Sequence, residues 1–307
     1  MLSYRDPTDD SINTVKKAFS HGLGGHIPRG ELWLGADLFK KANLEDDLEG
    51  RLTLIERLGQ DLLCLPLSDD KSTNRVMGYR YFSLREVEVA SKIRTFFLTV
   101  VVDGPFQRLT EKEGLMKILA GWKRERHEVA KEFEKERAEV ELLIAQCLEL
   151  SVDSVIIADD LAGEHSLMID PHDIQNLFSP FYVQAVSEIH RKHSYALFHS
   201  CGDITMIIPH LLSYGFDGLA AIQHRSNDLV ALKESYGAKL TFMAGIEPEI
   251  LEATEISMSA LKEYERLIRS LTPGGGFIIS SCSGLYSGDF LQRVQELYRI
   301  ADELFTN

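Results

Sequence analysis

The sequence predicts a single α/β barrel of eight parallel strands, (β/α)8, and two observations lead to this prediction. Short β-rich runs alternate along the chain with longer segments of helical periodicity, which is typical of parallel strand–helix–strand units. No repeat, low-complexity tract or linker divides the 307 residues. A chain of this length suits one barrel domain that spans residues 1–307.

Eight runs of β-branched and large apolar residues are the expected strands. They lie at 31–34, 62–67, 96–102, 154–158, 196–199, 218–222, 240–243 and 277–280. The region 75–84 alternates around Gly78, so we expect a hairpin inserted after the second strand.

Segments of helical length and periodicity follow most of these strands. They lie at 49–58, 124–150, 174–192, 204–214, 228–236, 258–271 and 289–304. In a barrel of this type the functional residues gather at the C-terminal ends of the strands. Chemically active side chains are therefore expected at those ends.

Composition limits the possible functions. Hydrophobic residues make up 44% of the chain, charged residues make up 26%, and the formal net charge is −14. This negative charge disfavours binding to nucleic acid or to an anionic membrane, but it leaves open a protein partner or a homo-oligomer. No membrane-spanning run and no signal peptide is apparent, so we expect a cytoplasmic protein.

The four cysteines fall into two groups. Cys64 and Cys147 lie within apolar segments and are expected to be inert core residues. Cys201 and Cys282 instead follow the fifth and eighth predicted strands, beside polar residues and glycines. Without an export signal, disulfide bonds are not expected.

His199, Cys201 and Cys282 form a candidate metal site. Residues two apart on a strand point to the same side, so His199 and Cys201 can reach one ion. Cys282 ends the eighth predicted strand. One imidazole and two thiolates suit zinc, and three protein ligands leave a fourth position open for a substrate. A His-x-Cys pair alone also arises by chance, and the third ligand at a strand end favours the metal site.

Three aspartates at strand ends are candidate catalytic residues. Asp159 and Asp160 follow the fourth strand and Asp103 follows the third. A carboxylate there could orient a substrate, accept a proton or hydrogen-bond a metal-bound imidazole. The alternative for the adjacent pair is that one residue caps a helix and the other is solvated. Trp33 and Tyr81 could line a substrate pocket, although such residues are more often simply packed.

Four segments carry a resemblance to a known family. They are FHSCGDI at 198–204, YGFDGL at 214–219, MAGIE at 243–247 and GGGFI at 274–278. With these segments the chain resembles the uroporphyrinogen decarboxylase superfamily. The His-x-Cys pair, followed by a cysteine some eighty residues later, is similar to its zinc-dependent branch of corrinoid (cobalamin) methyltransferases.

The resemblance implies a barrel of the uroporphyrinogen decarboxylase type and zinc held by His199, Cys201 and Cys282. It also implies methyl transfer between a small substrate, such as an aryl methyl ether or a thiol, and the cobalt of a corrinoid. The chain lacks the Asp-x-His-x-x-Gly corrinoid motif, so the corrinoid is expected on a partner protein. Some relatives supply a glutamate near the end of the sixth strand. Here Gln223, His224 and Glu247 are the candidates for the fourth zinc position or for substrate contact.

Two alternative functions remain open. One is a metal-independent decarboxylase that acts on a tetrapyrrole. The arginine-rich signature of that enzyme is replaced here by IPRGELW at 27–33. The other is a non-catalytic barrel that binds a corrinoid or a thiol.

Overall fold

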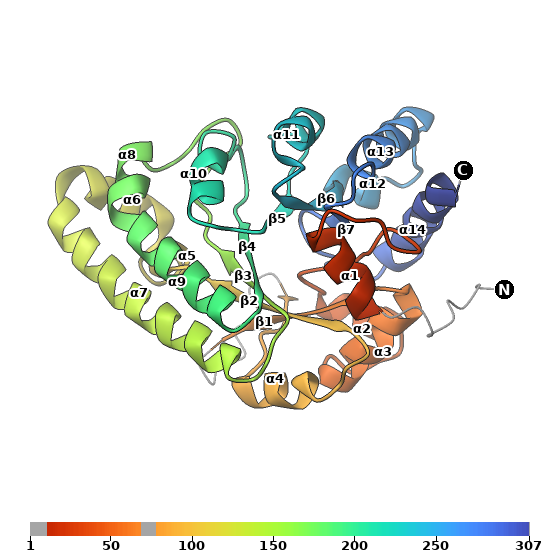
Figure 1. The fold of residues 1–307 in the computed structure, drawn as a ribbon, viewed down its shortest axis with the longest axis horizontal. Coiled ribbons are helices and arrows are strands. Elements are labelled where there is room, and N and C mark those ends of the chain that lie inside the picture. The colour runs from red at the N-terminus through yellow and green to blue at the C-terminus, as the bar shows by residue number, and fades with distance from the viewer. Residues whose placement is uncertain (1–10, 69–77, 307) are drawn as a thin grey trace.

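The protein is a parallel α/β structure with helices arranged around a curled sheet (Figure 1). The computed structural model describes residues 11–68 and 78–306. In these residues seven parallel strands pair in the order in which they occur in the chain. The strands are β1 (Leu62–Leu67), β2 (Phe97–Asp103), β3 (Ser154–Ala158), β4 (Tyr195–His199), β5 (Gly218–Ile222), β6 (Thr241–Ile246) and β7 (Phe277–Ser281). Seven of the eight predicted strands are thus confirmed, with shifts of a few residues at their ends.

Helices precede β1, connect the successive strands and follow β7. They are α1 (Ser11–Phe19), α2 (Ala36–Lys41), α3 (Leu48–Leu58), α4 (Leu84–Ser91), α5 (Pro105–Glu113), α6 (Leu115–Arg124), α7 (Arg126–Leu148), α8 (Pro171–Asp173), α9 (Ser179–Arg191), α10 (Ile208–Ser213), α11 (Leu229–Tyr236), α12 (Pro248–Glu252), α13 (Met258–Leu271) and α14 (Phe290–Thr306). A π-helical turn, Ile174–Phe178, leads into α9. None of the helices in the described residues is long and apolar enough to cross a membrane.

Alternate residues of the strands face two different cores. The larger core lies between the sheet and the outer helices and includes Val102, Ile157 and Phe198. The smaller one, which we call the inner core, includes Val101, Ala158, Leu197 and Ile278, together with residues of α1. This alternation follows from the two-residue period of a β-strand. It determines which strand-end side chains can meet inside the curl of the sheet.

Helix α1 fixes which end of the inner core is available for a site. Its Phe19 stacks on Tyr195, the first residue of β4, with ring centroids 4.1 Å apart. Phe19 also stacks on Phe97, the first residue of β2, at 5.7 Å. Helix α1 therefore covers the end of the inner core at which the strands begin. A site for small molecules is left at the opposite end, where the strands finish.

The prediction of a strand at 31–34 is wrong. The segment lies next to both edge strands, since the Arg29 carbonyl accepts from Asp61 N at 2.8 Å and Gly30 N donates to the Ile279 carbonyl at 3.1 Å. Within 31–34 the described residues form only one isolated bridge, at Leu34, and Arg29 just before the segment forms another. One reason is that the buried guanidinium of Arg51 donates to the Leu32 carbonyl at 3.0 Å. An eight-stranded sheet is therefore not observed in the described residues.

Glu31 anchors this segment to β7 and α14. Its buried carboxylate accepts from Ser281 N at 3.0 Å and from the Tyr298 hydroxyl at 2.8 Å. Burial raises the pKa of Glu31 from 4.5 to about 7. The folded protein therefore holds this proton more tightly than the unfolded chain does.

Replacement of Glu31 by glutamine is expected to flatten the pH dependence of stability. A raised pKa stabilises the fold below the unfolded pKa, and this contribution is lost as the pH rises from about 4.5 through about 7. The melting temperature of the wild type should fall over that window more steeply than that of Glu31→Gln. The exposed Glu56 on α3 supplies the control, Glu56→Gln. Parallel pH profiles for the wild type and Glu31→Gln would contradict the role given to Glu31.

The predicted hairpin at 75–84 lies partly outside the described residues. In the described part, Tyr79 bridges to Gly35 and Phe82 bridges to Leu67. This segment therefore lies against the C-terminal end of β1 and against the segment that ends at Gly35. It brings Tyr79 and Tyr81 toward the end of the sheet at which the strands finish.

Candidate metal centre

His199 presents one ring nitrogen for a metal ion. It is the last residue of β4, it continues the inner-core alternation from Leu197, and it is only 4% exposed. Its Nδ1 lies 2.8 Å from the carbonyl oxygen of Ala220 on β5. A carbonyl only accepts, so Nδ1 is the protonated nitrogen and donates. The other nitrogen, Nε2, then carries the free lone pair that a metal ion needs.

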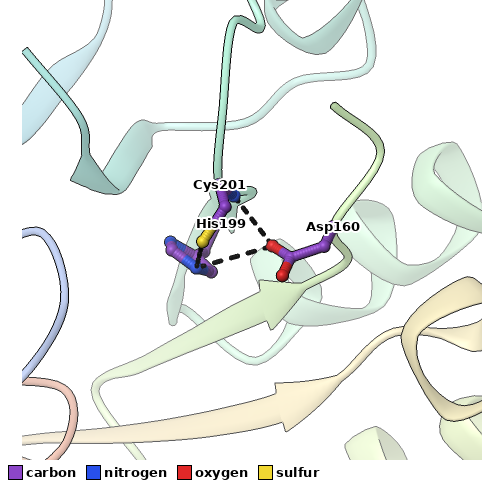
Figure 2. Close-up of side chains that lie close together, drawn as sticks. All are labelled: Asp160, His199 and Cys201. Atoms are coloured by element: carbon purple, nitrogen blue, oxygen red, sulfur yellow. Dashed lines mark hydrogen bonds and ion pairs between the residues drawn. The ribbon is translucent and has the colours of Figure 1, made fainter. Parts of the chain in front are cut away.

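Cys201 and Asp160 surround this nitrogen (Figure 2). The Cys201 sulfur lies 3.9 Å from His199 Nε2, and Asp160 Oδ1 lies 3.8 Å from the same atom. Asp160 Oδ1 also accepts a hydrogen bond from Cys201 N at 2.7 Å. The three ligand atoms all lie within 4.8 Å of one another. Ligand atoms of one tetrahedral zinc are about 3.3–3.8 Å apart at normal bond lengths, so small adjustments would fit an ion here.

Cys282 lies next to these three residues, but its sulfur is not among the ligand atoms that all lie within 4.8 Å of one another. It follows β7 on the inner-core alternation, it is 2% exposed, and its thiol interacts electrostatically with Cys201. The carboxylate of Glu247, which follows β6, contacts the same thiol. Glu247 Oε2 is buried and has no nitrogen or oxygen donor among the described residues. Two thiols, an imidazole and two carboxylates therefore meet at one end of the sheet.

Without a cation, both cysteines of this donor set are held as neutral thiols. Burial, followed by the charge of Asp160, raises the pKa of Cys201 to about 12. Burial and Glu247 raise the pKa of the Cys282 thiol further. A divalent ion reverses this preference, because it binds thiolates directly and offsets the charge of neighbouring carboxylates. The residues present therefore fit a zinc ion.

A bulge in β5 places Gln223 beside the site. Ala220 and Ala221 both belong to the inner core, the register with β6 shifts between Ala220 and Ile222, and Ala221 has a φ of 53°. An extra residue of this kind reverses the alternation that follows, so Gln223 points inward. Its Oε1 accepts from Gly202 N at 2.8 Å, which gives it a positioning contact in the loop that carries Cys201.

The ring of His224 is directed toward helix α13. Its backbone nitrogen donates to Glu247 Oε1. Its ring lies 3.5 Å from Glu263 Oε1 on α13 and is 30% exposed. Gln223, His224 and Glu247 were the candidates for the fourth zinc position. Of these, Glu247 is the one whose side chain contacts a predicted zinc ligand, Cys282.

Asp159 and Asp160 have separate surroundings. Asp159 continues the outer alternation from Ile157 and is fully buried. Its Oδ1 accepts from Gln107 N in the first turn of α5 at 2.7 Å, and its Oδ2 accepts from the Tyr182 hydroxyl of α9 at 2.8 Å. Burial raises its pKa to about 7. The structure therefore brings Asp160 to the candidate metal centre and directs Asp159 to the outer helices.

Aromatic side chains lie beside the centre. The Trp33 ring lies edge-on to His199, with centroids 4.9 Å apart, and Tyr79 lies 6.3 Å from Trp33. The Tyr81 hydroxyl hydrogen-bonds the carboxyl group of Asp103, the last residue of β2. The predicted residues Trp33, Tyr81 and Asp103 thus meet at the same end of the sheet as His199.

The sequence did not single out Asn227, which holds the loop after β4. Its Nδ2 donates to the Gly202 carbonyl at 2.9 Å, and its Oδ1 accepts from Ile204 N at 3.2 Å. Asn227 is distant in sequence from this loop and lies just before the cap of α11. No local pattern distinguishes such an asparagine from an ordinary loop residue.

Replacement of Gly202 by alanine is expected to destabilise the protein by about 3 kcal/mol. Gly202 has a φ of 80°, and an added Cβ would lie 2.2 Å from the Gly163 carbonyl oxygen. Both effects displace the loop that carries Cys201. Urea unfolding measures the change, and Gly163→Ala is the matched control, because its Cβ would lie 3.8 Å from its nearest neighbour. Equal unfolding midpoints for the two variants would contradict this account.

The fold is similar to several solved structures. A methyltransferase from Methanosarcina mazei matches with a TM-score of 0.73 and 13% identity, over 96% of this chain and 99% of that chain. A putative vitamin-B12-independent methionine synthase from Listeria monocytogenes matches with a TM-score of 0.54 and 10% identity, over 91% and 96%. A sugar phosphate isomerase/epimerase from Parabacteroides distasonis matches with a TM-score of 0.53 and 11% identity, over 89% and 95%. No curated protein sequence matches the chain.

The fold and the site together define a parallel α/β protein of the barrel class, with a candidate metal centre at the C-terminal ends of its strands. Residues 90–304 match the family described as uroporphyrinogen decarboxylase (URO-D). The chain belongs to this family, and the resemblance noted in its sequence motifs is confirmed at this level.

Proposed function

We propose that this protein is a zinc-dependent methyltransferase, which moves a methyl group between a small substrate and the cobalt of a corrinoid on a partner protein. The observation that carries the proposal is the free His199 Nε2 with Cys201 and Asp160 around it. The similarity in fold to a methyltransferase supports the reaction class. Cytoplasmic location and a possible homo-oligomer remain part of the proposal.

His199, Cys201 and Cys282 would hold the zinc ion. Bound zinc supplies Lewis acidity, which lowers the pKa of a thiol or stabilises a leaving oxygen. The Ala220 carbonyl keeps His199 in the tautomer that leaves Nε2 free. The Trp33 ring lies edge-on against the imidazole and would limit its rotation.

Asp160 is our candidate for the fourth position in the resting state. It is the carboxylate whose oxygen lies within 4.8 Å of both the His199 and the Cys201 ligand atoms. Its side chain is 35% exposed, so an incoming substrate can reach and displace it. Gln223 is bonded to Gly202 N and would have to break that contact in order to bind zinc. Glu247 is placed to accept a proton from Cys282.

Methyl transfer to free cob(I)alamin tests the proposed function. Zinc-loaded protein is mixed with cob(I)alamin and with aryl methyl ethers, methylated thiols or methylated amines, and the cobalt spectrum reports methylation. We expect methylation with at least one donor class, and its loss when zinc is chelated. Turnover of uroporphyrinogen without metal would indicate a decarboxylase instead. Stoichiometric zinc without methyl transfer in either direction would indicate a binding protein.

A further inference from the structure

Asp103 faces the same space as His199. Across the sheet, Asp103 pairs with Ala158, and Ala158 pairs with His199. All three continue the inner-core alternation. Parallel neighbours are about 4.8 Å apart, so the Cα atoms of Asp103 and His199 are separated by roughly 10 Å. At this level the strand between them contributes only the methyl group of Ala158, so no large side chain of that strand separates Asp103 from His199.

The surroundings of Asp103 favour its protonated form. Burial and the negative charge of Glu111 on α5 raise its pKa to about 7, and the nearby Asp159 adds to the effect. The Tyr81 hydroxyl and the Arg108 guanidinium act in the opposite direction. The side chain remains partly exposed. Asp103 is thus a carboxyl group that holds a proton near neutral pH and faces the candidate substrate space.

We propose that Asp103 is the general acid that protonates the leaving oxygen of a methyl donor, and that the substrates of this site are methyl ethers. This inference rests on the proposed function and selects one of its two substrate classes. The cob(I)alamin electron pair forms the new cobalt–carbon bond. The carbon–oxygen bond breaks, and its electron pair stays on the oxygen. That oxygen takes the proton from Asp103, so the products are methylcobalamin, a free alcohol or phenol, and the Asp103 carboxylate.

A thiol acceptor would not need this residue. Metal binding alone lowers the pKa of a thiol, and its proton passes to solvent. An ether instead releases an oxyanion, which is a poor leaving group until it is protonated or bound to a Lewis acid. A protonated acid across the space from His199 meets this need, and general acids of this kind accelerate reactions by about 10²–10⁴-fold.

The dependence of rate on leaving group tests the proposal. Methyl ethers of phenols with rising pKa are assayed with zinc-loaded protein and cob(I)alamin. We expect Asp103→Asn to slow the ether of unsubstituted phenol by roughly 100-fold or more and the ether of 4-nitrophenol by less than about 10-fold. Methylation of a thiol by methylcobalamin should fall by a smaller factor than cleavage of the ether of unsubstituted phenol. An equal loss for every ether, or no loss for any, would overturn the proposal.

Tyr81→Phe gives an independent readout. Its hydroxyl stabilises the ionised form of Asp103, so its removal should raise the pKa of Asp103 and shift the alkaline limb of the pH–rate profile upward. Carbon-13 NMR of aspartate-labelled zinc protein, without any corrinoid, should show a carboxyl titrating near pH 7 that is missing in Asp103→Asn. The absence of that titration would overturn the proposal.

The outcomes also separate this inference from the proposed function. A wild type that methylates thiols but cleaves no ether would overturn the role of Asp103 and leave the zinc methyltransferase in place. A wild type that binds zinc and transfers no methyl group in either direction would overturn both. In that case the NMR titration would still report the protonation state of Asp103.

Discussion

Replacement of His199 by alanine is expected to weaken zinc binding by more than about 100-fold and to abolish methyl transfer. The imidazole supplies the one neutral ligand, and its free Nε2 lies 3.8–3.9 Å from the Asp160 and Cys201 ligand atoms. Without it only the two thiolates and the Asp160 carboxylate remain around the ion, and no neutral ligand is left. Competition with a chromophoric chelator measures the affinity.

The cysteines provide the controls for this experiment. Cys282→Ser should weaken zinc binding as His199→Ala does, because Cys282 lies beside Cys201. Cys64 and Cys147 are buried in the inner core and in α7, which confirms the core role predicted for both. Cys64→Ser and Cys147→Ser should keep full zinc affinity even if they lose stability. Stoichiometric zinc at wild-type affinity in both His199→Ala and Cys282→Ser would show that zinc is not bound by these residues.

Alanine substitution at Asp159 is expected to lower stability, whereas alanine substitution at Asp160 is expected to weaken zinc binding. Asp159→Ala leaves Gln107 N and the Tyr182 hydroxyl without their buried acceptor. This should cost about 3 kcal/mol of unfolding free energy and leave zinc affinity unchanged. Asp160→Ala should weaken zinc binding by about 10-fold and change the stability of the zinc-free protein by less than about 1 kcal/mol.

Urea unfolding of zinc-free protein and a zinc titration, both made on the same two variants, test this contrast. Each variant is the control for the other, because the residues are adjacent and chemically identical. A loss of zinc affinity in Asp159→Ala with wild-type stability would contradict the assignment. So would equal zinc affinity in Asp160→Ala and the wild type.

The strand-end aspartates show how far the sequence predicts the site. Both were candidates because they follow the same predicted strand. The two-residue alternation, which runs inward through Ala158 and outward through Ile157, assigns Asp160 to the site and Asp159 to the outer helices. This distinction was therefore available in the sequence, through strand period alone.

Other features depend on tertiary contacts that no local pattern reveals. The segment 31–34 has the composition of a strand, but the Leu32 carbonyl is bonded by Arg51 from α3. Gln223 faces inward only because the bulge at Ala221 reverses the alternation of β5, and alanine is not a residue that marks a bulge. Helix α1 lacks an acidic first turn, and its position against the inner core depends on contacts with distant strands.

The most direct test of the metal centre is X-ray absorption at the zinc edge of the purified wild-type protein. We expect two sulfur ligands at about 2.3 Å, together with two nitrogen or oxygen ligands at about 2.0–2.1 Å. The sulfurs would be those of Cys201 and Cys282, and the lighter ligands would be His199 and a displaceable oxygen. A zinc ion with one sulfur ligand, or with none, would contradict this assignment.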